Sequence, residues 1–174
     1  MNILTRMCMS FDGCISTADG WPAQMADPSF VPGQSHGFPE FQQRLEAVLM
    51  GRTTFEPALE SERWPWPNLD VFVLGSHRPE GTPDHVVLES DPEALLGRIR
   101  EANHGGDVHL VGGPRTIETF RELGALDKLG VLVLPVLIVD GGRLAPPLSS
   151  ESKLTVESEQ VLPEGAVEIV YAAS

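Results

Sequence analysis

The pattern of apolar and polar positions predicts strands that alternate with helices along most of the chain. Short, nearly continuous apolar runs indicate buried strands, and segments with an apolar residue every three or four positions indicate helices. The predicted strands are 2–10, 48–50, 71–74, 86–88, 108–111 and 129–134, with a further apolar run at 136–139. The predicted helices are 40–47, 53–59, one that follows residue 90 and ends at 104–106, and 116–123.

Local signals set the expected helix ends. Ser90 stands three residues before Glu93, which is the spacing of a capping box, and Pro92 fits a first helical turn. Pro57 is expected to disturb or shorten the helix at 53–59.

The end of the chain has a different pattern. Segments 154–162 and 166–172 flank Pro163-Glu164-Gly165, which predicts an antiparallel hairpin with a short connection. We therefore expect one α/β domain over residues 1–174, with three layers: a mainly parallel central sheet, helices on both faces and a C-terminal antiparallel hairpin.

Residues 17–39 are rich in proline and glycine, and a long irregular stretch in a small domain is often functional.

Composition narrows the classes of function. The formal net charge of −13 opposes binding to duplex nucleic acid, and no basic run is visible. No apolar window is long enough to span a membrane, and the first eight residues are too polar for a signal peptide, so we expect a cytoplasmic protein. The two cysteines and five histidines show no metal-ligand spacing, so no metal site is expected.

Three predicted strands end in glycine followed by polar residues. In open α/β sheets, ligands bind at the carboxyl ends of the strands. Glycine turns that lead into helices leave backbone N–H groups facing outward beside the positive end of the helix dipole, which suits phosphate. A ligand with several phosphates, such as a dinucleotide, would fit the residues at these three ends: Gly51, Arg52, Thr53, Thr54; Ser76, His77, Arg78; Gly112, Gly113, Pro114, Arg115, Thr116.

Each of these features also has a plain structural explanation. The Gly112-Gly113 pair could simply form a strand-to-helix turn, since short glycine motifs are weakly specific. Arg78 could be a solvated turn residue, and Arg52 could pair with an acidic neighbour.

Four stretches together resemble a known family. The first stretch, Met9 to Ile15, contains the motif Ser-x-Asp-Gly, where x is any residue, and the second, 49–56, contains Met-Gly-Arg-Thr-Thr. The third is the glycine motif Val111-Gly112-Gly113, and the fourth is the late strand and loop at 126–144. The chain is similar in these stretches to the dihydrofolate-reductase-like superfamily. The branch it resembles is the pyrimidine reductase domain of riboflavin biosynthesis, the RibD C-terminal domain.

The resemblance implies NADPH as cofactor and a small heterocycle as substrate. Residues 51–54 and 111–116, including Val111, would hold the phosphates, and Arg78 would pair with the 2′-phosphate beside Ser76 and His77. The nicotinamide would lie near Gly13 and Ile15. Asp12 and Ser10 are the catalytic candidates, and the substrate-binding candidates are Trp21 and Phe38.

Departures from the family pattern keep alternatives open. Pyrimidine reductases carry Glu where this chain has Val111, and the chain contains no deaminase signature. Glu40 lies near the place of the acid of folate reductases. The alternatives are dihydrofolate reductase proper and a non-catalytic NADPH-binding protein. A homodimer is also expected, from the resemblance and from the apolar run at 129–139.

Overall fold

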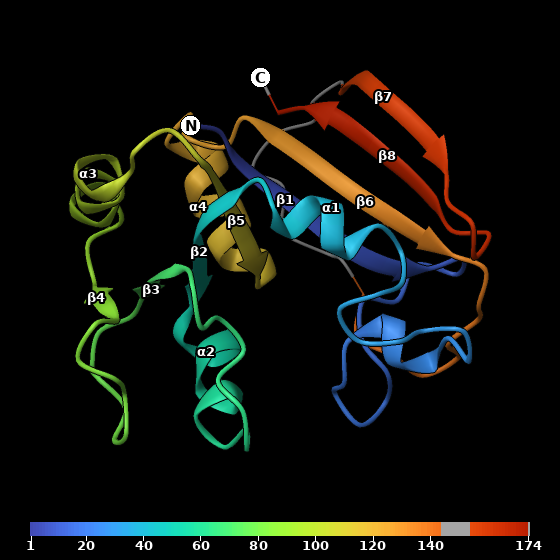
Figure 1. The fold of residues 1–174 in the computed structure, drawn as a ribbon, viewed down its shortest axis with the longest axis horizontal. Coiled ribbons are helices and arrows are strands. Elements are labelled where there is room, and N and C mark those ends of the chain that lie inside the picture. Colours follow the sequence, from blue (N-terminus) through green and yellow to red (C-terminus); the bar gives the residue numbers. More distant parts are fainter. Residues whose placement is uncertain (144–153, 174) are drawn as a thin grey trace. The chain divides into compact units, whose positions relative to one another are not determined.

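A computed structural model describes residues 1–143 and 154–173. The chain order is β1 (Ile3–Ser10), η1 (Ala23–Ala26), α1 (Phe38–Gln42), β2 (Leu45–Gly51), α2 (Arg52–Leu59), β3 (Asp70–Leu74), β4 (Val87–Glu89), α3 (Pro92–Ala102), β5 (Asp107–Gly112), α4 (Pro114–Glu122), β6 (Lys128–Leu134), β7 (Thr155–Val161) and β8 (Val167–Ala172). The alternation of strands and helices in its middle is the predicted α/β pattern (Figure 1).

The described strands form one hydrogen-bonded sheet in the order β4-β3-β2-β5-β1-β6-β8-β7. The pairs β3–β4, β2–β3, β2–β5 and β1–β5 are parallel, whereas β6–β8 and β7–β8 are antiparallel. The mainly parallel sheet and the C-terminal hairpin are therefore confirmed.

The chain divides into two compact units, each built from two separate segments. Unit 1 comprises Met1–Thr5 and Arg44–Asp127, and unit 2 comprises Arg6–Gln43 and Lys128–Ser174. In unit 1 the first strand is fixed to the far end of the second segment, because Ile3 N donates to Asp127 Oδ2 at 2.7 Å and Asp127 N donates to Ile3 O at 2.8 Å.

Each unit has its own apolar core. In unit 1, buried residues of β2 and β3 pack around Phe55 of α2 and Val86. In unit 2, Cys8 and Cys14 pack with residues of β6 and with Ala166. Strands buried on both faces explain why the sequence shows continuous apolar runs such as Ala47–Met50, whose four residues are all buried.

The structure corrects the expected helix at 40–47. The observed helix α1 covers only Phe38–Gln42, and β2 begins at Leu45, so residue 47 lies in a strand. The apolar spacing of Phe41, Leu45 and Val48 imitated a helical face. Pairing of β2 with both β3 and β5 decides the conformation instead, because tertiary contacts override a weak local preference.

Two smaller predictions also change. The cap of α3 is Asp91, whose carboxylate accepts from Glu93 N at 3.1 Å, while Ser90 N donates to Glu89 Oε1 at 2.8 Å. The apolar run at 136–139 forms no strand within the described chain, and its Leu137 and Val139 side chains are 70% and 83% exposed. Pro57 lies inside α2, which still runs from Arg52 to Leu59, so the expected shortening of this helix by proline does not occur.

Candidate functional site

The three glycine-bearing strand ends of unit 1 lie beside one another. β3, β2 and β5 are consecutive in the sheet and parallel, so their carboxyl ends share one edge. Gly51 is in register with Leu74, and Met50 is in register with Gly112. The sheet therefore brings together the three turns that the sequence singled out.

Glycine allows these turns to approach closely. A Cβ atom on Gly51 would lie 2.5 Å from Thr116 Oγ1, and one on Gly75 would lie 3.0 Å from the Arg52 Cβ. Gly112 has φ of 146°, a conformation that favours glycine, and the Gly112–Gly113 peptide is cis. The Gly51 position thus excludes any larger side chain unless Thr116 moves.

Two helices begin at this edge with glycine caps. Gly51 precedes α2 and Gly113 precedes α4, and a glycine has no side chain that could accept a hydrogen bond from the first-turn N–H groups. Free N–H groups and the helix dipole together attract anions. Thr53, Thr54 and Thr116 place hydroxyl-bearing residues in the same first turns. The donor set fits the phosphates of a dinucleotide.

The arginines near this edge differ in whether the protein already pairs them with a carboxylate. Arg52 forms an ion pair with Glu56 one turn later, which is the structural pairing that the sequence left open. Arg115, next to Pro114 in the first turn of α4, is exposed. Ser76 and His77 are also exposed, while Val111 is half-buried in β5.

The Arg78 side chain is hydrogen-bonded to two carbonyl groups of its own loop. Its Nη1 donates to Val86 O at 3.1 Å and its Nη2 donates to Pro83 O at 2.6 Å. The guanidinium therefore supports the 78–86 turn, and pairing with a phosphate would have to compete with these two carbonyls.

In unit 2, Ser10 and Asp12 form a polar turn after β1. Ser10 Oγ donates to Asp12 Oδ1 at 2.7 Å, and Ile138 N donates to the same oxygen at 2.9 Å. These two hydrogen bonds, first that from Ile138 and then that from Ser10, lower the pKa of Asp12. Asp12 is therefore held as a carboxylate, which accepts hydrogen bonds and is a poor proton donor.

A second loop, residues 136–143, is fixed to this turn. Phe11 N donates to Val136 O at 2.9 Å and Ile15 N donates to Gly142 O at 2.7 Å. Arg143 donates through Nη1 to the Asp12 carbonyl, and the same nitrogen lies 3.3 Å from where a Gly13 Cβ would be. Gly13, with φ of 88°, is thus held in a turn that a larger residue would strain.

The two substrate-binding candidates lie in different environments. Trp21 is 62% exposed, and its backbone N–H donates to Thr17 Oγ1 at 3.1 Å. Phe38 packs against the core of unit 2, and the Arg6 guanidinium lies 5.0 Å from its ring centroid. Phe38 therefore has a packing role in unit 2.

Sequence reasoning missed the polar anchors of unit 2. Arg143 lay inside the 126–144 stretch without an assigned role, and Glu164, which faces His36, lies more than a hundred residues further along the chain, so no local spacing signalled that contact. Within the described residues, no group of three or more His, Cys, Asp or Glu side chains could hold a metal ion, and no helix has the length and apolarity needed to cross a membrane.

Comparison with known proteins decides the family. The sequence matches the family model of the RibD C-terminal domain over residues 2–167. The chain belongs to this family. Among curated proteins, YwjB of Bacillus subtilis strain 168 is 23% identical over 95% of this chain and 94% of its own, and YyaP of the same strain is 24% identical over 97% of this chain and 93% of its own. Both carry the description of uncharacterized proteins.

Solved structures agree on the fold. A protein from Shewanella sp. PV-4, described as a riboflavin biosynthesis protein, has a TM-score of 0.79 at 22% identity, with 99% of this chain and 98% of that chain covered. A Thermotoga maritima deaminase/reductase has a TM-score of 0.67 at 15% identity, and the match covers 98% of this chain but 56% of that one. The RibD C-terminal fold expected from the sequence is confirmed.

Proposed function

We propose that this protein is an NADPH-dependent reductase of a small heterocyclic substrate, pyrimidine-like or pterin-like. The observation that carries the proposal is the shared edge in unit 1, where two glycine-capped helices begin side by side. Membership of the RibD C-terminal family supports the reductase assignment. The name of the similar Thermotoga maritima protein includes a 5-amino-6-(5-phosphoribosylamino)uracil reductase, which supports a pyrimidine-like substrate.

In this proposal the residues of unit 1 bind and orient the cofactor. The N–H groups at the start of α2 and α4 bind phosphate oxygens, and the nearby hydroxyls add donors. Arg115 is exposed at the start of α4 and is the cation best placed to neutralise phosphate there. NADPH, when bound, supplies a hydride to the substrate.

Ser10 and Asp12 are the candidates for orienting the substrate. The Asp12 carboxylate stays ionised, so it accepts a hydrogen bond from an N–H of the heterocycle and does not itself deliver a proton. Ser10 holds that carboxylate through its hydroxyl. Because the described Asp12 is a poor acid, a non-catalytic NADPH-binding protein is the second candidate function.

Calorimetric titration tests the cofactor. We expect wild-type protein to bind NADPH more tightly than NADH, and Arg115→Ala to weaken NADPH binding about tenfold or more, since charge-assisted hydrogen bonds contribute about 1.5–3 kcal/mol. Arg100→Ala removes the same charge from an exposed position at the end of α3 and should leave the affinity unchanged. Equal affinities in both variants, or no binding of either nucleotide, would reject the cofactor site.

Turnover separates the two candidates. Oxidation of NADPH in the presence of pyrimidine or pterin substrates supports the reductase, and activity with dihydrofolate would assign the folate reaction instead. Tight NADPH binding without turnover across such a panel would favour the non-catalytic protein.

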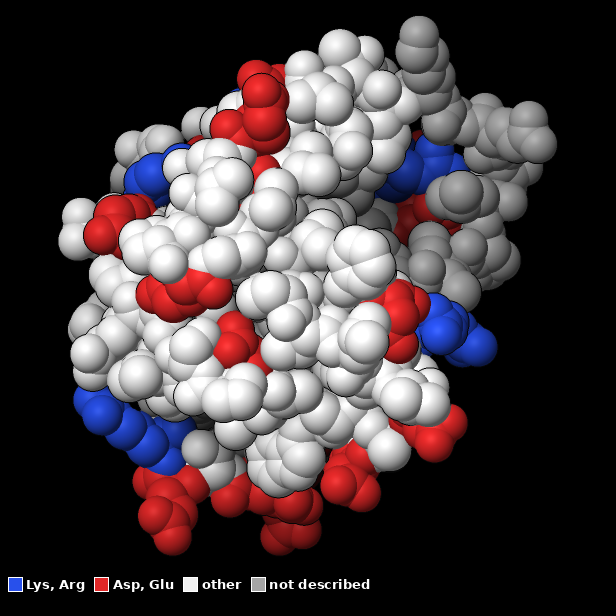
Figure 2. Space-filling model, turned by 90° about the vertical axis from the view of Figure 1, so that its right-hand side faces the viewer, with Lys and Arg blue, Asp and Glu red and all other residues white. Residues whose placement is uncertain are grey.

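Homodimer formation and a cytoplasmic location belong to the same proposal. The exposed Leu137 and Val139 offer apolar surface for a second copy. Both free cysteines suit a reducing compartment. Most of the face in Figure 2 is uncharged, and the basic groups visible there are separate from one another. Light scattering on wild-type protein and on Leu137→Asp tests the dimer: a wild-type monomer would reject it.

A further inference from the structure

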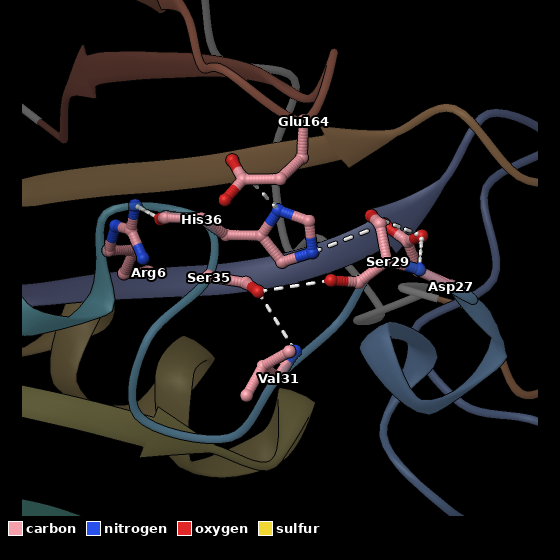
Figure 3. A network of polar contacts seen from close by, with 7 residues as sticks. All are labelled: Arg6, Asp27, Ser29, Val31, Ser35, His36 and Glu164. Carbon is pink, nitrogen blue, oxygen red and sulfur yellow. Dashed lines mark hydrogen bonds and ion pairs between the residues drawn. The ribbon is translucent and has the colours of Figure 1, made fainter.

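A buried histidine lies between two carboxylates in unit 2 (Figure 3). The His36 side chain is fully buried; its Nε2 lies 3.2 Å from Asp27 Oδ2, and its Nδ1 lies 3.9 Å from Glu164 Oε2. Asp27 and His36 bracket one irregular segment, whereas Glu164 belongs to the turn between β7 and β8. Each ring nitrogen therefore faces a carboxylate oxygen from a different side.

The irregular segment is organised around this ring. Ser29 donates to Asp27 Oδ1 through both its backbone N–H, at 2.9 Å, and its hydroxyl, at 2.7 Å. Ser35 Oγ donates to Ser29 O at 3.1 Å and accepts from Val31 N at 2.8 Å. Only the second carboxylate oxygen of Asp27 is left to face His36.

The backbone of His36 is held in an uncommon conformation. Its φ is 58°, in the left-handed region, which a residue other than glycine keeps only where its surroundings fix it. Phe30 stacks on the ring at a centroid distance of 5.8 Å, and Arg6 Nη2 donates to His36 O at 2.5 Å. The ring is thus directed at the carboxylates by contacts on several sides.

The polar atoms that face one another around the ring are buried. Asp27 Oδ2, both ring nitrogens and Glu164 Oε2 are buried, and none has an aligned hydrogen bond within the described part of the chain. Burial also raises the pKa of the nearby Cys8 thiol to about 12, so that thiol stays neutral. A buried polar atom without a partner is costly, so this arrangement requires compensation.

The surrounding charges do not supply that compensation. The Arg6 guanidinium, which comes from β1, is paired with Glu168 of β8 through Nε at 2.5 Å. Among the described residues, the ion-pair contacts found for the Asp27 and Glu164 carboxylates are those with the His36 ring.

The chemistry of imidazole identifies what is missing. A neutral ring has one N–H donor and one lone pair, so it satisfies one carboxylate and turns a lone pair toward the other. We propose that the closed Asp27–His36–Glu164 cluster holds one extra proton, in addition to the one that a neutral imidazole beside two ionised carboxylates would carry. This extra proton latches the 27–38 segment to the β7–β8 turn. The latch is a reversible proton-binding site: closing takes up a proton from solvent and opening returns it.

The sign of the pH dependence follows from linkage. The closed state holds more protons than the open state, so raising the pH favours opening. The equilibrium constant for closing falls by up to tenfold for each pH unit, over the range in which the open cluster has lost the extra proton and the closed cluster still holds it. This inference does not rest on the proposed reductase activity, since it concerns residues that need no cofactor.

Hydrogen exchange of the segment's own amides measures the latch in the intact protein. Ser35 N donates to Val31 O and Phe38 N donates to Ser35 O, so both amides exchange when the segment opens. Base-catalysed exchange alone gives a slope of one for log rate against pH. We expect a slope of two for these amides where opening releases a proton, and a slope of one for Asn103, whose N–H donates to Ile99 O at the end of α3.

Two matched variants assign the effect. Glu164→Gln supplies an amide donor to the Nδ1 lone pair, so the extra proton is no longer needed and the slope should return to one. Glu159→Gln makes the same chemical change on exposed β7 and should keep the slope of two. A slope of one in the wild type, or a slope of two that persists in Glu164→Gln, would overturn the proposal.

A spectrum of the wild-type protein provides a test that does not depend on the stability of a variant. Nitrogen-15 shifts of the His36 ring and carboxyl carbon shifts of Asp27 and Glu164 report where protons reside at neutral pH. We expect either a doubly protonated ring or one protonated carboxyl group. A neutral ring beside two ionised carboxylates would refute the latch and would assign the buried atoms to a bridging water.

Discussion

Gly51 offers a sharp test of the close packing at the phosphate-suited edge. Its backbone φ of −78° is accessible to any residue, so Gly51→Ala brings no backbone strain. The new Cβ would lie 2.5 Å from Thr116 Oγ1, and Thr116 is 6% exposed, which restricts its rearrangement. Overpacking of this kind costs about 1–3 kcal/mol. For a chain of this size, that lowers the melting temperature by about 2–12 °C.

The second half of the test is a double-mutant cycle. In a Thr116→Ala background the offending oxygen is gone, and the remaining Thr116 contact, to Cβ, is 3.8 Å from the new methyl group. Gly51→Ala should then cost less than about 0.5 kcal/mol, so the coupling free energy between the two changes should be about 0.5–3 kcal/mol. Urea unfolding of the four proteins measures it. An equal cost of Gly51→Ala in both backgrounds would refute the packing argument.

Three further outcomes are expected. Gly97→Ala, in the middle of α3 where a new Cβ meets nothing within 4 Å, should raise the free energy of unfolding by about 0.5–1 kcal/mol in the same urea assay, and a loss would contradict the helix geometry. Asp12→Asn should be less stable than wild type, by a margin that is constant at neutral pH. Because the Ile138 N–H lowers the pKa of Asp12, this difference in the free energy of unfolding should shrink as the pH falls below about 4. A difference that grows in acid would contradict the stabilisation of the ionised carboxylate. Cys8, whose pKa burial raises to about 12, and buried Cys14 should resist a thiol reagent at pH 8 until denaturant is added, and rapid labelling of the folded protein would contradict their burial.

The sequence predicted the strand ends because the relevant rule is local. Each buried strand appears as an apolar run, and parallel strands place the following turns at one edge, so the proximity of 51–54 and 112–116 could be predicted from the sequence alone. The same reasoning failed at 40–47, where Phe41, Leu45 and Val48 happened to match a helical spacing. There the conformation depends on strand partners distant in sequence.

Side-chain partners were less accessible to prediction than the backbone. Arg78 was expected to be available for a phosphate, but its partners are carbonyl groups of its own loop, which no charge pattern reveals. His36 meets Glu164 across most of the length of the chain, and a lone histidine gives no sign of that contact. Buried polar clusters depend on tertiary proximity, whereas hydrophobic periodicity depends on local geometry.

The division of the chain has a consequence for synthesis on the ribosome. Unit 1 ends at Asp127, which closes it by exchanging hydrogen bonds with Ile3, so all of its residues are made before the 47 residues from 128 to 174. Unit 2 needs residues 6–43 and 128 onward, so its early half waits while unit 1 is completed. At about 5–20 residues per second, residues 128–174 take about 2–9 s to make. During that interval the apolar residues of β1 beyond Thr5 lack their final partners, and a nascent chain has its greatest need of a chaperone.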